Sequence, residues 1–200
     1  MTRTIVVVSA GLNDPSSTRL LADLLAKAAT EAMDEPAAVK VVELRPLAHA
    51  LTDQLLTGFA TGDLAAAEKA VAEADAVIAV TPVFSASYSG LFKTFFDVLE
   101  PGALEGTPVL VAATAGTARH SLVLEHALRP LFSHLHAVIV PTGVFAASED
   151  FAGTALALRI DRAGRELATL VAARGETRRP DRFLRDLAAM GDFEDMLRGA

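Results

Sequence analysis

Five short runs of apolar, mostly β-branched residues recur along the chain and constrain its fold more than any other feature. Each run is nearly continuous and does not alternate apolar with polar residues. Such runs are typical of strands buried on both faces, as in a parallel sheet covered by helices. The sequence therefore predicts five strands, at residues 4–8, 39–44, 76–80, 108–113 and 137–140.

Helical patterns separate these runs. Apolar residues three and four positions apart predict helices at residues 17–33, 64–73, 90–99, 119–135 and 151–173. Regular alternation of strand and helix predicts a doubly wound α/β sheet, because right-handed crossovers make successive strands parallel. Five strands with helices on both faces fit a flavodoxin-like fold with strand order 2-1-3-4-5.

The length of 200 residues fits one domain with an appendage. We assign residues 1–174 to the flavodoxin-like domain. From residue 175 onward the pattern breaks: the segment is charged, contains Pro180, and has only a weak amphipathic pattern. We expect residues 175–200 to form a tail that is mobile or packed against a partner.

Composition excludes several classes of function. A net charge of −7 is a poor match for nucleic acid, which needs a basic face. With no cysteine, the chain has no disulfides, thiolate nucleophiles or Cys-ligated metals, and its five histidines show no ligand spacing. No apolar run approaches the roughly 20 residues that span a membrane, and the first run stops too early for a signal peptide. We expect a cytoplasmic protein with no metal, membrane or nucleic-acid site.

Ligands of doubly wound sheets bind beyond the carboxyl ends of the strands. The loop after the first predicted strand lacks both the G-x-G-x-x-G and P-loop motifs but carries Ser9, Ser16, Ser17 and Thr18. Hydroxyls beside a helix N-terminus suit one phosphate group, with Arg19 available as a charge partner. The alternative, that Ser16 or Ser17 simply caps the helix, is compatible with phosphate binding.

The connection after the third predicted strand, residues 81–90, reads TPVFSASYSG. Strand-to-helix loops usually have 2–6 residues, so its length is unusual. An apolar wall with hydroxyl and backbone donors suits a flat heteroaromatic ligand, although its aromatic residues could merely plug the end of the sheet. The candidate residues are Pro82, Val83, Phe84, Ser87 and Tyr88.

The loop after the fourth predicted strand contains Thr114, Gly116 and Thr117. Small residues let backbone N–H groups approach the edge of a ligand closely. This loop is weak evidence alone, but it gains weight because it emerges at the same edge of the sheet as the other two.

Together the three loops resemble the NADPH-dependent FMN reductase family, in particular flavin reductases that partner luciferase-like or alkanesulfonate-type monooxygenases. The resemblance spans residues 3–173, and its most specific part is the P-V-[FY]-x-x-S-Y-S-G-x-x-K stretch that begins at Pro82. It implies FMN as cofactor, with its phosphate at Ser9, Ser16, Ser17 and Thr18. The isoalloxazine would lie against residues 82–84, with residues 87–88 nearby, and its pyrimidine edge against residues 116–117.

The sequence departs from the family pattern in three places. Residues 11–14 occupy a stretch where relatives often carry an Arg, Phe84 replaces a common Tyr, and Ser85 replaces a Lys found in some relatives.

The resemblance also implies the reaction: NADPH or NADH donates hydride to flavin N5, and the reduced flavin supplies a partner monooxygenase. This transfer requires no catalytic side chain, because the cofactors carry the chemistry. The family forms homodimers or homotetramers, in which the helix with Lys93 and Asp97 lies at the contact. The alternatives are an electron carrier or flavin-binding module, and a quinone, chromate or azo-dye reductase on the same scaffold.

Overall fold

The computed structural model describes residues 2–174, so the expectation for residues 175–200 lies outside the described part of the chain. The strands are β1 Arg3–Ser9, β2 Ala37–Glu43, β3 Ala76–Phe84, β4 Ser87–Tyr88, β5 Pro108–Ala115, β6 Val138–Ile139 and β7 Val144–Ala147. The α-helices are α1 Ser17–Glu31, α2 Ala48–Thr57, α3 Gly62–Ala72, α4 Gly90–Asp97, α5 Arg129–His134 and α6 Thr154–Arg174.

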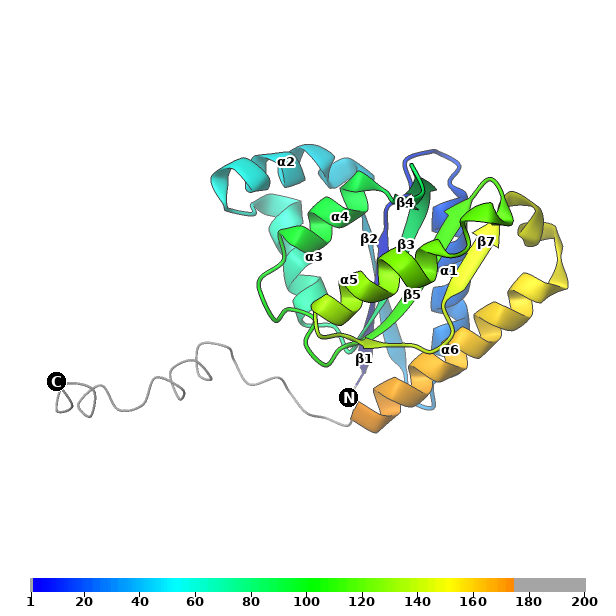
Figure 1. Cartoon of the computed structure of the whole chain (residues 1–200). Coiled ribbons are helices and arrows are strands. Elements are labelled where there is room, and N and C mark those ends of the chain that lie inside the picture. The colour runs from blue at the N-terminus through cyan, green and yellow to red at the C-terminus, as the bar shows by residue number, and fades with distance from the viewer. Residues whose placement is uncertain (1, 175–200) are drawn as a thin grey trace, which may run out of the picture.

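The sheet has the order β2-β1-β3-β5-β6, with β4 paired to β3 and β7 paired to β5 (Figure 1). With β5 as the fourth strand and β6 and β7 together as the fifth, this is the predicted flavodoxin-like order 2-1-3-4-5. The prediction of one fifth strand at residues 137–140 is wrong in detail, because two short strands, β6 and β7, stand in its place. Val140, after β6, still donates to the carbonyl of Val109, but Pro141 has no N–H to donate, so the ladder to β5 stops there and resumes at β7.

Helices cover both faces of the sheet, and alternate strand residues contribute to two separate cores. Ile5 and Val7 of β1 pack with residues of α1 and α6. Val6 and Val8 pack with residues of α2, α3, α4 and α5 (Figure 1). The central strands are buried on both faces as predicted, but β2 is mostly exposed because it is an edge strand. In the described residues no helix combines the length and apolarity needed to cross a membrane.

Helix α6 packs closely on α1. A Cβ at Gly164 of α6 would lie 2.8–2.9 Å from backbone atoms of Ala28 and Ala29. Only a residue without a side chain permits this approach.

The predicted helix at residues 119–135 is wrong as a single element. The structure has a 3₁₀ turn at Ala118–His120, a π-helical turn at Leu124–Leu128, and then α5. Pro130 offers no N–H, and its ring crowds the carbonyl four residues before it. A wider π-helical turn just before the proline relieves that conflict.

Candidate functional site

The three candidate loops leave the sheet at one edge. Ser9 pairs in register with Val80, and Pro82 pairs with Thr114. The carboxyl ends of β1, β3 and β5 are therefore neighbours, so residues more than one hundred positions apart in the chain meet there (Figure 1).

The loop before α1 folds tightly over Gly11. A Cβ at this position would lie 2.2 Å from Oγ of Ser16 and 3.3 Å from Cβ of Thr18. Ser16 is the N-cap of α1, and its hydroxyl accepts a hydrogen bond from the backbone N–H of Arg19 at 3.2 Å. The capping interpretation is therefore confirmed.

This helix N-terminus keeps a partial positive charge. The first turn of α1 has no acidic residue, so no side chain there neutralises the helix dipole. Ser9 and Thr18 are buried at this edge, and Ser17 is exposed. Unpaired backbone N–H groups, nearby hydroxyls and a loop that approaches closely fit the needs of a phosphate group.

Thr18 also connects this loop to β5. Its hydroxyl lies 2.8 Å from the hydroxyl of Thr114, and both side chains are buried. The sequence predicts Thr114 as a loop residue in contact with the ligand, but β5 extends through Ala115 and includes it. The pair joins the start of α1 to the strand that leads into Gly116.

Carboxylates engage Arg19 in this structure, and its role as a charge partner for a phosphate stays a prediction. Its guanidinium donates to Asp23 at 2.8 Å and to Glu43, at the end of the edge strand β2. The hydrogen bond to Asp23 raises the pKa of Arg19, and Glu43 adds to the effect. Two carboxylates therefore satisfy the charge that was expected to meet a phosphate.

Residues 81–90 do not form the long open loop that the sequence predicts. β3 continues to Phe84 and turns directly into β4, with Val83 paired to Tyr88. The two turn residues, Ser85 and Ala86, have φ of 48° and 67°, as a two-residue hairpin of the primed type requires. The segment expected to form an apolar wall is thus a hairpin at the carboxyl ends of the strands.

Hydrogen bonds fix the base of this hairpin. The buried hydroxyl of Thr81 accepts from the backbone N–H of Ser89 at 3.0 Å, and Ser89 in turn caps α4. Beyond this base Phe84 is 46% exposed, although large aromatic side chains are usually buried. Pro82 and Val83 are half-buried beside it.

The loop after β5 leaves open space at the same edge. Gly116 and Thr117 are exposed, and a Cβ at Gly116 would meet no atom within 4 Å. The exposed ring of Phe84 in the hairpin and the small exposed residues Gly116 and Thr117 in this loop together suit a flat ligand.

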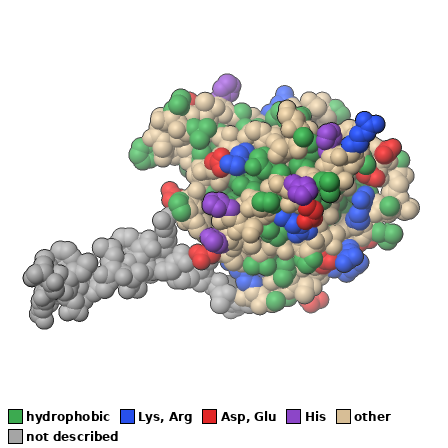
Figure 2. Space-filling view, viewed as in Figure 1, with side chains coloured by type: hydrophobic (Ala, Val, Ile, Leu, Met, Phe, Trp, Pro, Cys, Tyr) green, Lys and Arg blue, Asp and Glu red, His purple; other side chains and the backbone are tan. Residues whose placement is uncertain are grey.

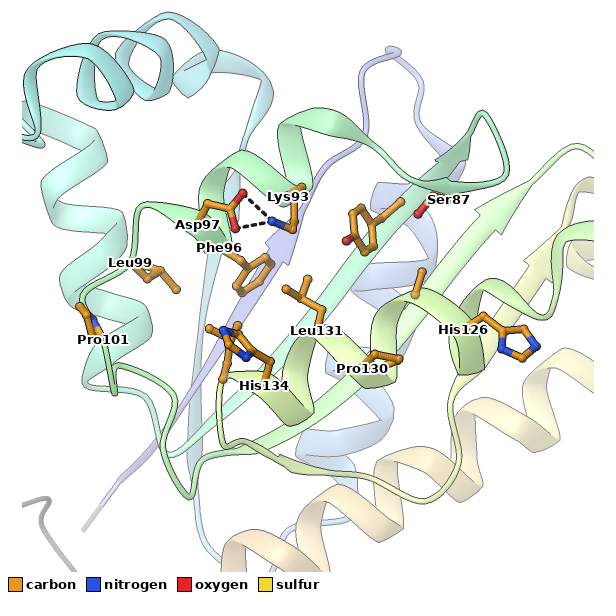
Figure 3. Close-up of a pocket in the computed structure, with 13 residues that line it drawn as sticks. Ser87, Lys93, Phe96, Asp97, Leu99, Pro101, His126, Pro130, Leu131 and His134 are labelled. Carbon is orange, nitrogen blue, oxygen red and sulfur yellow. Dashed lines mark hydrogen bonds and ion pairs between the residues drawn. The ribbon is translucent and has the colours of Figure 1, made fainter.

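Two candidate residues are placed differently from the others. Ser87 and Tyr88 line a groove of about 550 Å³ between α4 and α5, whose walls also include Phe96, Leu131 and His134 (Figure 3). None of the other residues proposed for the ligand lines this groove. The ring of Tyr88 packs 6.0 Å from that of Phe92, so this part of the motif contacts the core as well.

One ion pair marks the rim of the groove. Nζ of Lys93 lies 2.5–2.6 Å from both carboxylate oxygens of Asp97 (Figure 3). Figure 2 shows histidine and hydrophobic side chains interspersed over this face of the molecule. The sequence pattern marked the helix with Lys93 and Asp97, but it did not indicate that α5 would complete a groove.

Comparison with known families gives a match over residues 3–152, to the family described as NADPH-dependent FMN reductase. An FMN reductase (NADPH) from Pseudomonas aeruginosa is 38% identical over 177 residues, which cover 86% of this chain and 94% of that protein. The NADH-dependent FMN reductase SfnF of Pseudomonas fluorescens is 42% identical over 150 residues, 74% of this chain and 78% of that protein.

Solved structures agree with this relationship. An oxidoreductase from Corynebacterium diphtheriae superposes with a TM-score of 0.84 at 49% identity, over 86% of this chain and 98% of that one. The apo form of the NADH:FMN oxidoreductase EmoB superposes with a TM-score of 0.80 at 27% identity, over 92% and 99%. The chain therefore belongs to the NADPH-dependent FMN reductase family and is an NAD(P)H:FMN oxidoreductase.

Proposed function

We propose that FMN binds across the carboxyl edge of the sheet, with its phosphate at the start of α1 and its ring between the β3–β4 hairpin and the loop after β5. The observation that carries this proposal is the tight fold of residues 11–18, in which Gly11 leaves space only for the hydroxyl of Ser16. The residues proposed to line the site are Ser9, Ser16, Ser17, Thr18, Pro82, Val83, Phe84, Thr114, Gly116 and Thr117. The sequence also predicts Ser87 and Tyr88 there, and both belong to the same hairpin, but their side chains line the groove between α4 and α5.

The nucleotides supply the redox chemistry, in which hydride passes from nicotinamide C4 to flavin N5. The chain contributes binding and orientation. At the start of α1, backbone N–H groups and the hydroxyls of Ser16 and Thr18 are proposed to hold the phosphate. At the other end, the backbone N–H groups around Gly116 are proposed to meet the ring edge and stabilise the negative charge that develops there.

The proposed product is reduced FMN that leaves the enzyme and supplies a flavin-dependent monooxygenase in the cytoplasm. An open edge supports release, because Phe84, Gly116 and Thr117 are all exposed and no described segment covers them. The resemblance of the three loops to reductases with such partners supports the monooxygenase as acceptor.

We also propose that the protein is a homodimer or homotetramer in which a second copy covers the groove between α4 and α5. Leu55 and Leu56 in the last turn of α2, and Phe59 two residues after its end, are exposed by 56–82%. Exposed apolar side chains and a groove lined by both apolar and charged residues are typical of a contact between subunits. Light scattering should show a dimer or tetramer that Ala127→Arg, in the groove, converts to smaller species. A wild-type protein that is monomeric at micromolar concentration would exclude the proposed homodimer or homotetramer.

The enzymatic proposal is tested by measuring NADH and NADPH oxidation by the purified chain with and without added FMN. Oxidation that depends on added FMN, and that saturates as FMN is raised, supports a reductase that uses FMN as substrate. Flavin binding with no oxidation of either nucleotide contradicts the proposal and indicates a binding module or electron carrier. The same assay at equal concentrations of the two nucleotides measures which one is preferred.

A further inference from the structure

Two buried hydroxyls face each other in the proposed phosphate site. Oγ1 of Thr18 and Oγ1 of Thr114 are 2.8 Å apart, and each residue is 3% exposed. A hydroxyl has one hydrogen to donate and two lone pairs that accept. In this pair one threonine donates and the other accepts, and the hydrogen of the accepting residue remains available for another partner.

We propose that Thr114 is a positioning residue for the FMN phosphate: it donates to Thr18 and so directs the hydroxyl hydrogen of Thr18 to a phosphate oxygen. The inference rests on the proposed FMN site. A phosphate oxygen offers only acceptors, so Thr18 can contribute to binding only as a donor. The reverse direction would present lone pairs of Thr18 to an anion, which is repulsive.

The chain Thr114–Thr18–phosphate has a further consequence, because hydrogen bonds in series polarise one another inside a protein. Thr114 is buried in β5 between its partners in β3 and β7, so its side chain starts from a rigid strand. It therefore restricts the Thr18 hydroxyl to one orientation. Because Gly116 follows two residues later, the same strand end also sets the distance between the phosphate and the ring edge.

Burial alone does not explain the pair. Thr107, just before β5, is fully buried, and its hydroxyl has no hydrogen-bond partner among residues 2–174. This fold thus accepts a buried threonine without a partner. The contact between Thr114 and Thr18 joins residues 96 positions apart at the proposed site, which favours a role in binding.

The test compares Thr114→Val, which keeps the shape of the side chain and removes the hydroxyl, with Thr114→Ser, which keeps the hydroxyl. Thr107→Val is the matched control at a second buried threonine. Binding of FMN and of riboflavin, which has no phosphate, is measured by flavin fluorescence. Thermal melting without flavin checks that each variant folds.

We expect Thr114→Val to raise the Kd for FMN about three- to tenfold, because it removes the neutral hydrogen bond that orients the Thr18 hydroxyl toward the phosphate. The Kd for riboflavin should stay at the wild-type value. Thr114→Ser should restore most of the FMN affinity, and Thr107→Val should bind both flavins like the wild type. In a Thr18→Val background, Thr114→Val should have little further effect, because its proposed partner is already absent.

Equal losses for FMN and riboflavin in Thr114→Val would overturn the inference, because they would place Thr114 against the ring. Unchanged FMN binding in a folded Thr114→Val would overturn it too. If Thr114→Val does not fold, a folded Thr114→Ser that binds FMN as weakly as Thr18→Val also overturns the inference. A wild type that binds neither flavin is a different outcome, because it contradicts the proposed FMN site itself.

Discussion

The substitution Gly11→Ala tests the loop that carries the proposed phosphate site. The added methyl group would lie 2.2 Å from Oγ of Ser16, and contacts at 3.2 and 3.3 Å to Cβ of Ser16 and of Thr18 leave little room on either side. A serine side chain moves only by rotation about χ1. Such a rotation takes Oγ away from the backbone N–H of Arg19, with which it caps α1.

The magnitude follows from the two contacts that the rotation removes. Loss of a serine N-cap costs about 1 kcal/mol of unfolding free energy. Loss of a hydroxyl donor to a phosphate costs a further 1.5–3 kcal/mol of binding, roughly a tenfold or greater rise in the Kd for FMN. Urea unfolding measures the first quantity, and flavin fluorescence titration measures the second.

Gly153→Ala is the control for this experiment. Its φ is −106°, and the nearest atom to its Cβ would be a carbonyl oxygen at an ordinary 3.6 Å. This variant should bind FMN like the wild type. If Gly11→Ala also binds FMN with wild-type affinity, the loop before α1 does not hold the phosphate and the reasoning fails.

Three further substitutions probe the site and its support. Gly116→Val should leave the melting temperature unchanged, since its Cβ meets no protein atom, but should weaken FMN binding; normal binding would mean that the ring lies elsewhere. Gly164→Ala should lower the free energy of unfolding by about 1–3 kcal/mol, because its Cβ meets the backbone of α1. An exposed helical Gly→Ala change usually stabilises, so a stabilised variant would refute the close contact. Burial opposes ionisation of Glu166, but hydrogen bonds from Arg162 and Thr142 prevail and lower its pKa. Because the folded-state pKa is lowered, its contribution is present above the unfolded pKa and lost as pH falls through the folded one. Glu166→Gln should therefore cost about 1 kcal/mol in urea unfolding at pH 7, and this cost should shrink as the pH is lowered below the ordinary range of a glutamate; a cost that does not change with pH would contradict this.

The sequence was sufficient to predict the strand order and the edge at which the candidate loops meet. Continuous apolar runs identify buried strands, and their alternation with helices determines the topology. The sequence was not sufficient to predict α2. Leu55 and Leu56 are exposed, so the apolar residues of this helix do not lie on one side, as those of a surface helix usually do. Pro141 divides the fifth strand, and the second piece, Val144–Ala147, was too short to recognise.

The sequence predicted which loops form the candidate site, but it did not predict the contacts within the site that join residues distant in the chain. The β3–β4 hairpin went unrecognised because Ser85 and Ala86 replace the Gly or Asn that usually marks such a turn. Glu43, which pairs with Arg19, lies 24 positions away, and no local pattern indicates that pairing. No local pattern distinguishes Gly11 from its loop neighbours either, although its lack of a side chain is what lets the loop close.

The most direct test of the account is a crystal structure of the chain with FMN bound. We expect the phosphate within hydrogen-bond distance of the hydroxyls of Ser16 and Thr18, and the ring between Phe84 and Gly116. Flavin seated in the groove between α4 and α5, with the loop of residues 11–18 free of phosphate, would contradict it.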